Sequence, residues 1–196
     1  MIEPNFTIPD KVNKIIYSYY PKDSIAFKYY YTHCIKVTEL ALKIIDYNHH
    51  LNIRKDLVIL GSMLHDIGII KTDAPEIGCF GDKPYIAHTY LGREMLEQEG
   101  LLEVALMCER HIGVGLTRQD IIAANFPLPL RDMVPVTLEE KLVCYADKFY
   151  SKSEKHLTIP RTPDKIRKKI IKYGTDKLQK FEEFIDLFGI GFIKVG

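Results

Sequence analysis

Four histidines and two aspartates fall where the surrounding apolar pattern predicts the buried face of a helix. Desolvating a carboxylate is costly, so such residues are rarely buried without a partner. One histidine on an apolar face is usually hydrogen-bonded within the core, but six such residues would each need a separate partner. A shared divalent metal satisfies them together, because neutral imidazole and carboxylate are standard ligands of zinc, iron, manganese and nickel. The six residues are His33, His65, Asp66, His88, His111 and Asp147.

Two of these residues, His65 and Asp66, are adjacent in the chain. They lie in the stretch GSMLHDIGIIKT, residues 61–72, close behind the apolar run of residues 57–60. The other three histidines provide a comparison, because His49 and His50 lie in a polar run and His156 lies in a Ser/Lys-rich segment. We expect those three to be solvated, which separates them from the six residues on apolar faces.

Helical periodicity dominates the chain and would place the six residues on several helices. No period-two alternation is convincing, so we predict an all-α fold. Residues 71–87 and 112–136 are irregular and contain Pro and Gly, and we predict loops there, the second with one or two short helical turns. The predicted helices run from Asp10 to before Pro21, from Asp23 or Ser24 to about His49, from Asp56 to near Gly68, from His88 to near Gly100, from Leu101 to about His111, from Thr137 past Asp147, from Thr162 to Gly174, and from there to about Phe188.

Several of these boundaries carry recognisable start signals. Thr137 and Glu140 have the spacing of a capping box. Thr162 followed by Pro163 is typical of a helix start with proline at the first helical position. Asp56 is expected to cap the helix that leads to the His65–Asp66 pair.

The length of 196 residues suits one domain with a sizeable core. We expect residues 1–22 to pack on a metal-binding helical domain formed by residues 23–160, with residues 161–196 adding C-terminal helices to that domain. The formal net charge is +1, which gives no global field that would favour nucleic acid or an anionic membrane. We therefore predict neither as a partner, and we leave the oligomeric state open, with a homodimer as one option.

The cellular location is predicted from what the sequence lacks. The first ten residues show no secretory signal pattern, and no apolar run approaches the roughly 18 to 20 residues needed to cross a bilayer. The four cysteines show no C-x-x-C spacing, and three lie in apolar helical patterns, where free cysteine behaves as a small hydrophobe. A reduced, cytoplasmic protein is the prediction.

The spacing of His33, His65-Asp66 and Asp147 resembles the H…HD…D signature of the HD-domain superfamily, most members of which are metal-dependent phosphohydrolases. HDIG at residues 65–68 matches a variant after which one subgroup is named. His88 and His111 look like the two extra ligands of members that hold a pair of metals. The resemblance covers roughly residues 31–150 and implies a helical bundle of the HD-domain type.

The resemblance also implies how the ligands are divided. His33, His65, Asp66 and Asp147 would hold one divalent metal, and Asp66 would bridge to a second held by His88 and His111. Two such cations can share a hydroxide and clamp a phosphoryl group for in-line attack. The sequence leaves the metal open among iron, manganese, zinc, nickel and cobalt.

Phosphate contacts are predicted from basic residues near the ligands, since the chain has no Walker-type or G-x-G-x-x-G motif. Lys71 and Arg118 are the candidates that we place beside Asp66 as catalytic residues. Further candidates are Arg110 and Lys148, although Lys148 is expected to diverge from Asp147 by about 100 degrees around the helix. The basic run of residues 165–172 is expected to be a solvated helix face. The two predicted loops would wall the substrate pocket, with Tyr85 and Phe126 as residues that stack on a base or close a lid.

We predict hydrolysis of a phosphate ester or anhydride, with a nucleotide or dinucleotide as the small-molecule substrate. Ile69 follows HDIG and no G-Y-P element is present, which argues against the cyclic-di-GMP phosphodiesterases, and the further motifs of the (p)ppGpp enzymes are absent. The ligand set is closer to small stand-alone members such as diadenosine tetraphosphate hydrolases. Two alternatives stay open: a mixed-valence diiron oxygenase, which uses the same six ligands, and a non-catalytic module that senses a ligand.

Overall fold

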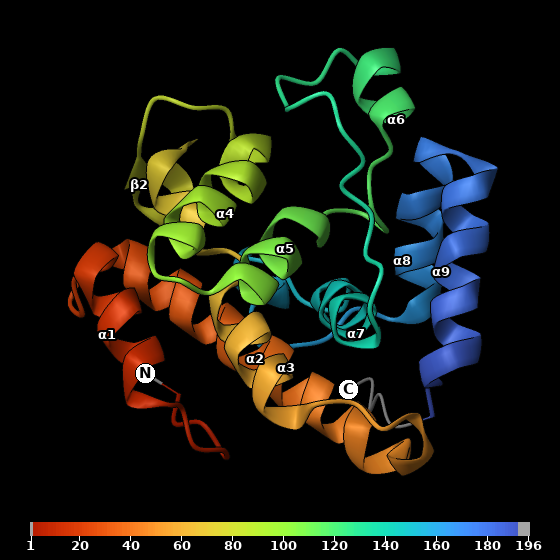
Figure 1. The fold of residues 1–196 in the computed structure, drawn as a ribbon, viewed down its shortest axis with the longest axis horizontal. Helices are drawn as coiled ribbons and strands as arrows, with labels where there is room; N and C mark the ends of the chain where they lie inside the picture. Colours follow the sequence, from red (N-terminus) through yellow and green to blue (C-terminus); the bar gives the residue numbers. More distant parts are fainter. Residues whose placement is uncertain (1, 192–196) are drawn as a thin grey trace.

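Helices make up most of the computed structural model, which describes residues 2–191 (Figure 1). The α-helices of this part of the chain are α1 Asp10–Tyr19, α2 Ile25–Tyr47, α3 Lys55–Leu64, α4 His88–Gln98, α5 Leu102–Arg110, α6 Arg118–Ala123, α7 Leu138–Asp147, α8 Pro163–Ile170 and α9 Thr175–Phe188. The predicted helical fold is confirmed. The segment 71–87 differs from the predicted plain loop, because strands β1 Asp73–Ala74 and β2 Cys79–Phe80 pair there antiparallel.

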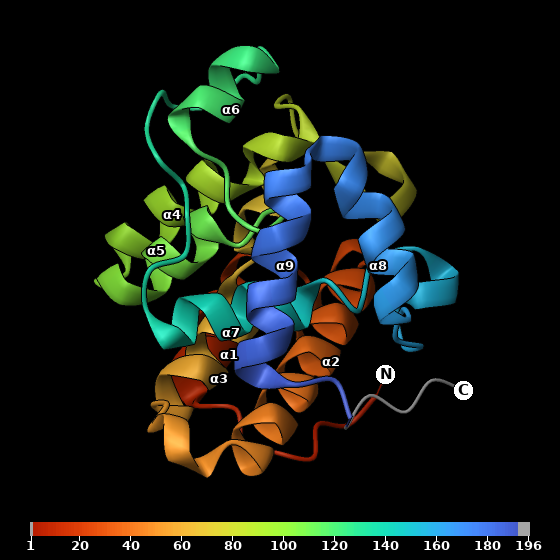
Figure 2. The ribbon, with the colours of Figure 1, turned by 90° about the vertical axis from the view of Figure 1, so that its right-hand side faces the viewer.

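Helix α2 is the element around which the others assemble. Helix α3 packs along α2, and α7 contacts both of them, while α5 packs against α3, α4 and α7. Helices α8 and α9 contact each other, and α9 also contacts α7. Figure 2 shows this C-terminal pair side by side, with α9 running across the front of α7. Helix α7 therefore lies between the α2–α3 pair and α9.

One hydrophobic cluster joins helices from both ends of the described chain. It includes Ile16 of α1, and it includes Phe181, Phe184 and Phe188 of α9, whose spacing of three and four residues places them on one helix face. Phe188 stacks on Tyr145 of α7 with ring centroids 5.5 Å apart. The described residues of the segments 1–22 and 161–196 thus pack on the same core, whereas residues 1 and 192–196 lie outside the described residues. In the part of the chain that is described, no helix combines the length and apolarity needed to span a membrane.

The helix that leads to the His65–Asp66 pair starts earlier than predicted. Ser24 caps α2 as expected, its side chain accepting from the Phe27 N–H at 3.0 Å. Asp56 does not cap α3, because it is already the second residue of that helix. The residue before the helix is Arg54, whose backbone N–H donates to Glu139 Oε1 at 3.1 Å. This contact between α7 and the start of α3 fixes the chain before Asp56 is reached.

The start of α7 carries half of the predicted capping box. Thr137 Oγ1 accepts from the Glu140 N–H at 3.2 Å, as expected. The Glu140 carboxylate, however, accepts from Arg110 Nη1 at 3.0 Å and from the Val136 N–H at 2.7 Å instead of returning to Thr137. The prediction of a complete capping box was wrong, because the Glu140 carboxylate forms an ion pair with Arg110 instead. Helix α7 ends at Asp147, where we had expected it to continue.

Candidate metal centre

The His65–Asp66 pair lies in the turn that follows α3. We expected that helix to end near Gly68, but it ends at Leu64, and a 3₁₀ turn covers Ile67–Lys71. The turn packs closely against α4, where a Cβ atom on Gly68 would lie 2.2 Å from the His88 carbonyl oxygen. Glycine therefore lets the turn approach the start of α4, and that approach brings Asp66 beside His88.

Two buried tyrosines hold the same turn from the other side. Tyr30 Oη donates to the Met63 carbonyl at 2.6 Å. Tyr20 Oη donates to the Ile67 carbonyl at 3.1 Å and accepts from the Ile70 N–H at 3.0 Å. Their rings stack with centroids 4.3 Å apart. These hydrogen bonds flank the His65–Asp66 pair and fix its backbone before any ligand binds.

A first cluster gathers His33 of α2, His65, Asp66 and Asp147 at the end of α7. The His33 Nε2 atom lies 3.3 Å from His65 Nε2, 3.2 Å from Asp66 Oδ2 and 3.0 Å from Asp147 Oδ1. The His65 Nε2 atom lies 3.1 Å from the same Asp66 Oδ2. Four nitrogen and oxygen donors thus converge on one point from three parts of the chain. We call these four residues cluster one.

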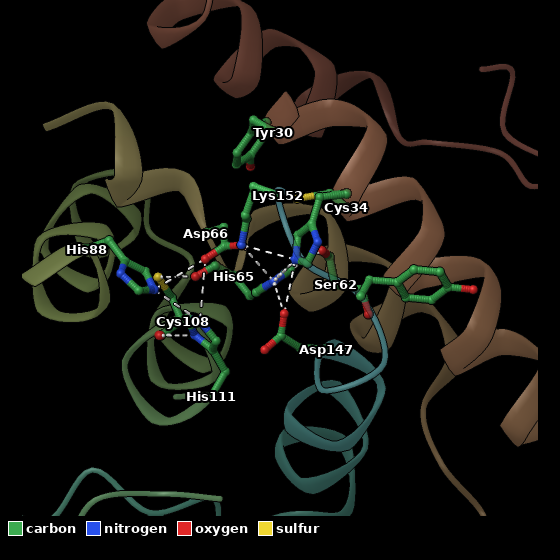
Figure 3. A network of polar contacts seen from close by, with 12 residues as sticks. Tyr30, Cys34, Ser62, His65, Asp66, His88, Cys108, His111, Asp147 and Lys152 are labelled. Atoms are coloured by element: carbon green, nitrogen blue, oxygen red, sulfur yellow. Dashed lines mark hydrogen bonds and ion pairs between the residues drawn. The ribbon is translucent and has the colours of Figure 1, made fainter. Parts of the chain in front are cut away.

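A second cluster shares Asp66 and adds His88 and His111. The Nε2 atoms of His88 and His111 lie 3.2 Å apart, and they lie 3.3 Å and 3.4 Å from Asp66 Oδ1. Figure 3 shows Asp66 between these two imidazoles and the side chains of His65 and Asp147. We call Asp66, His88 and His111 cluster two. The two oxygens of Asp66 therefore face different clusters.

Backbone carbonyls set the orientation of three of the imidazoles. Each Nδ1 lies 2.6–2.7 Å from the carbonyl oxygen three residues earlier, so Nδ1 carries the hydrogen. In a neutral ring this leaves Nε2 with its lone pair directed at the cluster, as in metal-binding histidines. The three residues are His65, His88 and His111. In His33 the Nδ1 atom is buried without a hydrogen-bond partner among the described residues.

Protonation differs between the two clusters. Burial lowers the pKa of His88 to about 3; Asp66 acts in the opposite direction, and His111 and Lys152 lower the pKa further. Burial also lowers the pKa of His111. For His65, burial lowers the pKa but Asp66 and Asp147 raise it more, to about 9. The two imidazoles of cluster two are thus neutral. His65 of cluster one, by contrast, carries a second proton and a positive charge when no metal is bound.

Cluster two fits a cation for a physical reason. Its two imidazole lone pairs and one carboxylate oxygen face each other, and Asp66 Oδ1 is buried without a hydrogen-bond partner in residues 2–191. Leaving a buried acceptor unsatisfied is costly, and a charged one more so. A divalent cation would satisfy all three donors at once. Cluster one, with two carboxylates and two imidazoles, has the donor types of zinc, iron or manganese sites.

Lys152 is a residue of the centre that the sequence did not predict. It follows α7 by five residues, is mostly buried, and forms an ion pair with Asp66 Oδ2. Burial alone would lower its pKa, but Asp66 raises it, so the ammonium stays charged beside the carboxylate. Its position in a loop gave no periodicity that could have marked it as buried.

Two buried thiols support the backbone behind the ligands. Cys108 Sγ donates to the His65 carbonyl at 2.8 Å, and Cys144 Sγ donates to the His111 carbonyl at 3.2 Å. Burial raises the pKa of both thiols, so they stay protonated donors. All four cysteines are buried and free.

A cavity of about 740 Å³ opens from the two clusters. Tyr85 and Phe126 line it, one from each of the segments 71–87 and 112–136, and both segments were expected to wall a pocket. Lys148 also lines it, although the sequence suggested that it would diverge, and its Nζ lies 2.8 Å from Asp147 Oδ2. A further wall comes from residues 161–177, which sequence reasoning had assigned to a solvated helix face in part.

The other predicted phosphate contacts lie elsewhere. Lys71 is exposed and is not part of the cavity wall. The Arg118 N–H donates to Asp132 Oδ1 at 2.8 Å at the start of α6, and Arg118 is not part of the wall either. Arg110 is engaged by Glu140. The structure therefore brings together the six predicted ligand residues but not these three cations.

The relatives with significant similarity to the chain include the following three proteins. The chain is 39% identical over 120 residues to an uncharacterised protein of Methanocaldococcus jannaschii, which covers 59% of this chain and 62% of the relative. It is 29% identical over 181 residues to a tRNA (cytidine(56)-2'-O)-methyltransferase of Thermoplasma volcanium, which covers 91% of this chain and 47% of the relative. A methyltransferase of the same name from Picrophilus torridus is 31% identical over 128 residues, which covers 65% of this chain and 33% of the relative. The chain thus spans less than two thirds of each relative.

The family comparison agrees with the resemblance predicted from the ligand spacing. No solved structure matches the chain significantly. The HD domain family matches residues 30–151, more than half of the chain and a range that contains both clusters. This protein is therefore a member of the HD domain family.

Proposed function

We propose that this protein is a metal-dependent phosphohydrolase that cleaves a phosphate ester or anhydride of a nucleotide-like molecule. The observation that carries the proposal is the division of the Asp66 carboxylate. Its Oδ2 faces His33 and His65, and its Oδ1 faces His88 and His111, at 3.1–3.4 Å in every case. A buried carboxylate shared in this way suits a bridging role between two cations.

The chain's own groups would hold and orient the two cations. When bound, such a pair supplies Lewis acidity toward phosphoryl oxygens and lowers the pKa of water. Asp147 and the four imidazoles would complete the ligand sets, and the backbone carbonyls behind His65, His88 and His111 would keep the rings oriented. Six protein donors for two cations leave coordination positions free for substrate, as in catalytic sites.

The cavity wall supports an anionic substrate with an apolar or aromatic part. Lys148 and Lys152 are paired with Asp147 and Asp66, and they would become available to phosphoryl oxygens when bound cations neutralise those carboxylates. Tyr85 and Phe126 provide aromatic faces in the same cavity. A nucleotide combines both features. The cationic wall favours the hydrolase over an oxygenase whose substrate is an uncharged molecule.

Two relatives bear the name of tRNA methyltransferases, which gives a reason to test RNA-derived substrates. A panel should therefore contain nucleoside mono-, di- and triphosphates, dinucleoside polyphosphates, and tRNA. We keep the small-molecule substrate as the proposal, because the centre lies at the base of a cavity and not on an open surface. A cytoplasmic location, a homodimer and the absence of a nucleic-acid partner stay predictions.

The test is phosphate release by protein reconstituted separately with manganese, iron(II), zinc, nickel and cobalt. Release should require metal and should be lost in Asp147→Asn purified in parallel, which controls for a contaminating phosphatase. Metal-loaded protein that releases no phosphate from any compound would contradict the proposal. An oxygen-dependent product together with a mixed-valence iron signal in EPR would favour the oxygenase instead.

A further inference from the structure

The wall formed by residues 161–177 lies beyond the part of the chain that matches the HD domain family, which ends at residue 151. One face of α8 and the turn after it lines the cavity, with residues at steps of three and four. Figure 2 shows α8 beside α9, and α9 crossing in front of α7, the helix that ends in Asp147. The lining residues of this face are Ile166, Lys169, Ile170 and Tyr173. The cavity is thus closed by a segment that lies outside the part matched by the HD domain family.

Cations outnumber carboxylates in the cavity, and most of them have partners. Lys152 is paired with Asp66 and Lys148 with Asp147. A third, Lys177, lies 2.5 Å from the Oδ2 atom of Asp120, a residue of α6. These three charges are therefore compensated by the protein.

Two further cations of the wall have no carboxylate partner among the described residues. Arg161 donates from Nη1 to the Tyr150 carbonyl at 2.9 Å and to the Lys148 carbonyl at 3.4 Å, so carbonyls orient it without neutralising it. Lys169 has neither an ion pair nor a hydrogen bond within residues 2–191. Of the five donors of a guanidinium, only those on Nη1 are engaged in Arg161. The wall therefore carries two positive charges that have no direct ion pair with a carboxylate among the described residues, although Asp147 acts on both from a distance.

The two cations also lie close enough to influence each other. The Lys169 side chain is exposed at the cavity wall; partial burial first, and then Arg161 and Lys148, lower its pKa, while Asp147 acts in the opposite direction. Burial lowers the pKa of Arg161, with Asp147 acting in the opposite direction. Like charges held together without a counterion are unfavourable, and a bound anion relieves that cost.

We propose that Arg161 and Lys169 form an anion subsite that binds a second phosphate group of the substrate, apart from the phosphoryl group held at the metal clusters. The substrate class is then a nucleotide with at least two phosphate groups, and not a monophosphate. This inference rests on the proposed function for its first phosphate. Lys169 acts as the flexible point charge, and the Arg161 fork supplies directional donors.

The test measures binding of non-hydrolysable probes by calorimetry on the metal-loaded protein. The probes are methylphosphonate, with one anionic group, and alkylene bisphosphonates with one to three methylenes between the phosphorus atoms. The variant is Lys169→Met, and the matched control is Lys168→Met, which removes the same charge from the same helix; both lysines are exposed, but only Lys169 lines the cavity. Because binding is read directly, the test does not depend on turnover.

We expect at least one bisphosphonate to bind more tightly than methylphosphonate, and to bind about fivefold more weakly to Lys169→Met than to the unaltered protein, as for a partly exposed charge pair. Lys168→Met should change neither probe. Equal weakening of both probes, no difference between the two variants, or no preference for any bisphosphonate would overturn the subsite. A missing phosphatase activity with this binding pattern intact would instead refute the proposed function alone.

Discussion

Replacing Asp66 by asparagine removes the one carboxylate that both clusters share. The substitution keeps the shape of the side chain, and it leaves cluster one with Asp147 but leaves cluster two with two neutral imidazoles. Changing groups that only support a metal ligand typically costs 10–100-fold in affinity, so loss of the ligand itself should cost at least about 100-fold in cluster two, or about 2.7 kcal/mol. Cluster one should weaken less, because it keeps a charged donor.

The assay is a metal titration followed by calorimetry, after the protein has been stripped with a chelator. Asp73→Asn serves as the matched control, because it makes the same substitution at an exposed carboxylate on β1. His111→Gln should weaken only cluster two, since His111 is not part of cluster one. Unchanged affinity at both sites in Asp66→Asn, or the same loss pattern in Asp66→Asn and His111→Gln, would refute the shared-ligand reasoning.

Further predictions concern the groups that hold the centre. Tyr20→Phe should lower the free energy of unfolding by about 1–3 kcal/mol, because it leaves a buried carbonyl and N–H of the 67–71 turn unpaired; an unchanged urea midpoint would contradict this. Gly68→Ala should destabilise the protein by about 1–3 kcal/mol or more and lower the metal affinity of cluster two, because the new Cβ would overlap the His88 carbonyl. Thermal melting and metal titration would test this prediction, and normal metal binding would contradict the packing argument. Metal binding at pH 7–8 should release a proton from His65, because its raised pKa of about 9 keeps it positively charged in the metal-free protein. The metal affinity of cluster one should therefore rise with pH up to about 9 and then level off. Calorimetry in buffers of different ionisation enthalpy would detect the released proton, and its absence would contradict this prediction.

The sequence predicted the centre well because the six residues lie on regular helices or directly at their ends. Helical spacing shows which side of a helix faces the core, and a titratable residue on that side needs a partner. His33 and Asp147 come from helices more than 100 residues apart, yet each was recognisable from its own apolar stripe. The division of the Asp66 oxygens between two clusters, by contrast, was an implication of the resemblance and became a geometric observation only with the fold.

The basic residues were harder to predict, because adjacency in the chain says little about adjacency in space. Lys71 and Arg118 were chosen for their closeness to ligands in the sequence, but neither lines the cavity. Lys152 reaches Asp66 from a loop, where no periodicity indicates direction. Lys169 lies in the basic run that the sequence predicts to be a solvated face; it is exposed, but it also lines the cavity, which only the fold shows.

Metal content tests the central claim most directly. Elemental analysis of protein purified without added metal, or reconstituted and then dialysed, should give two divalent ions per chain, and the Asp66→Asn variant should retain fewer under the same dialysis. EPR on the same sample would identify mixed-valence iron if it is present. Protein that holds no metal even after reconstitution would contradict the account, because the six buried donors would then need another explanation.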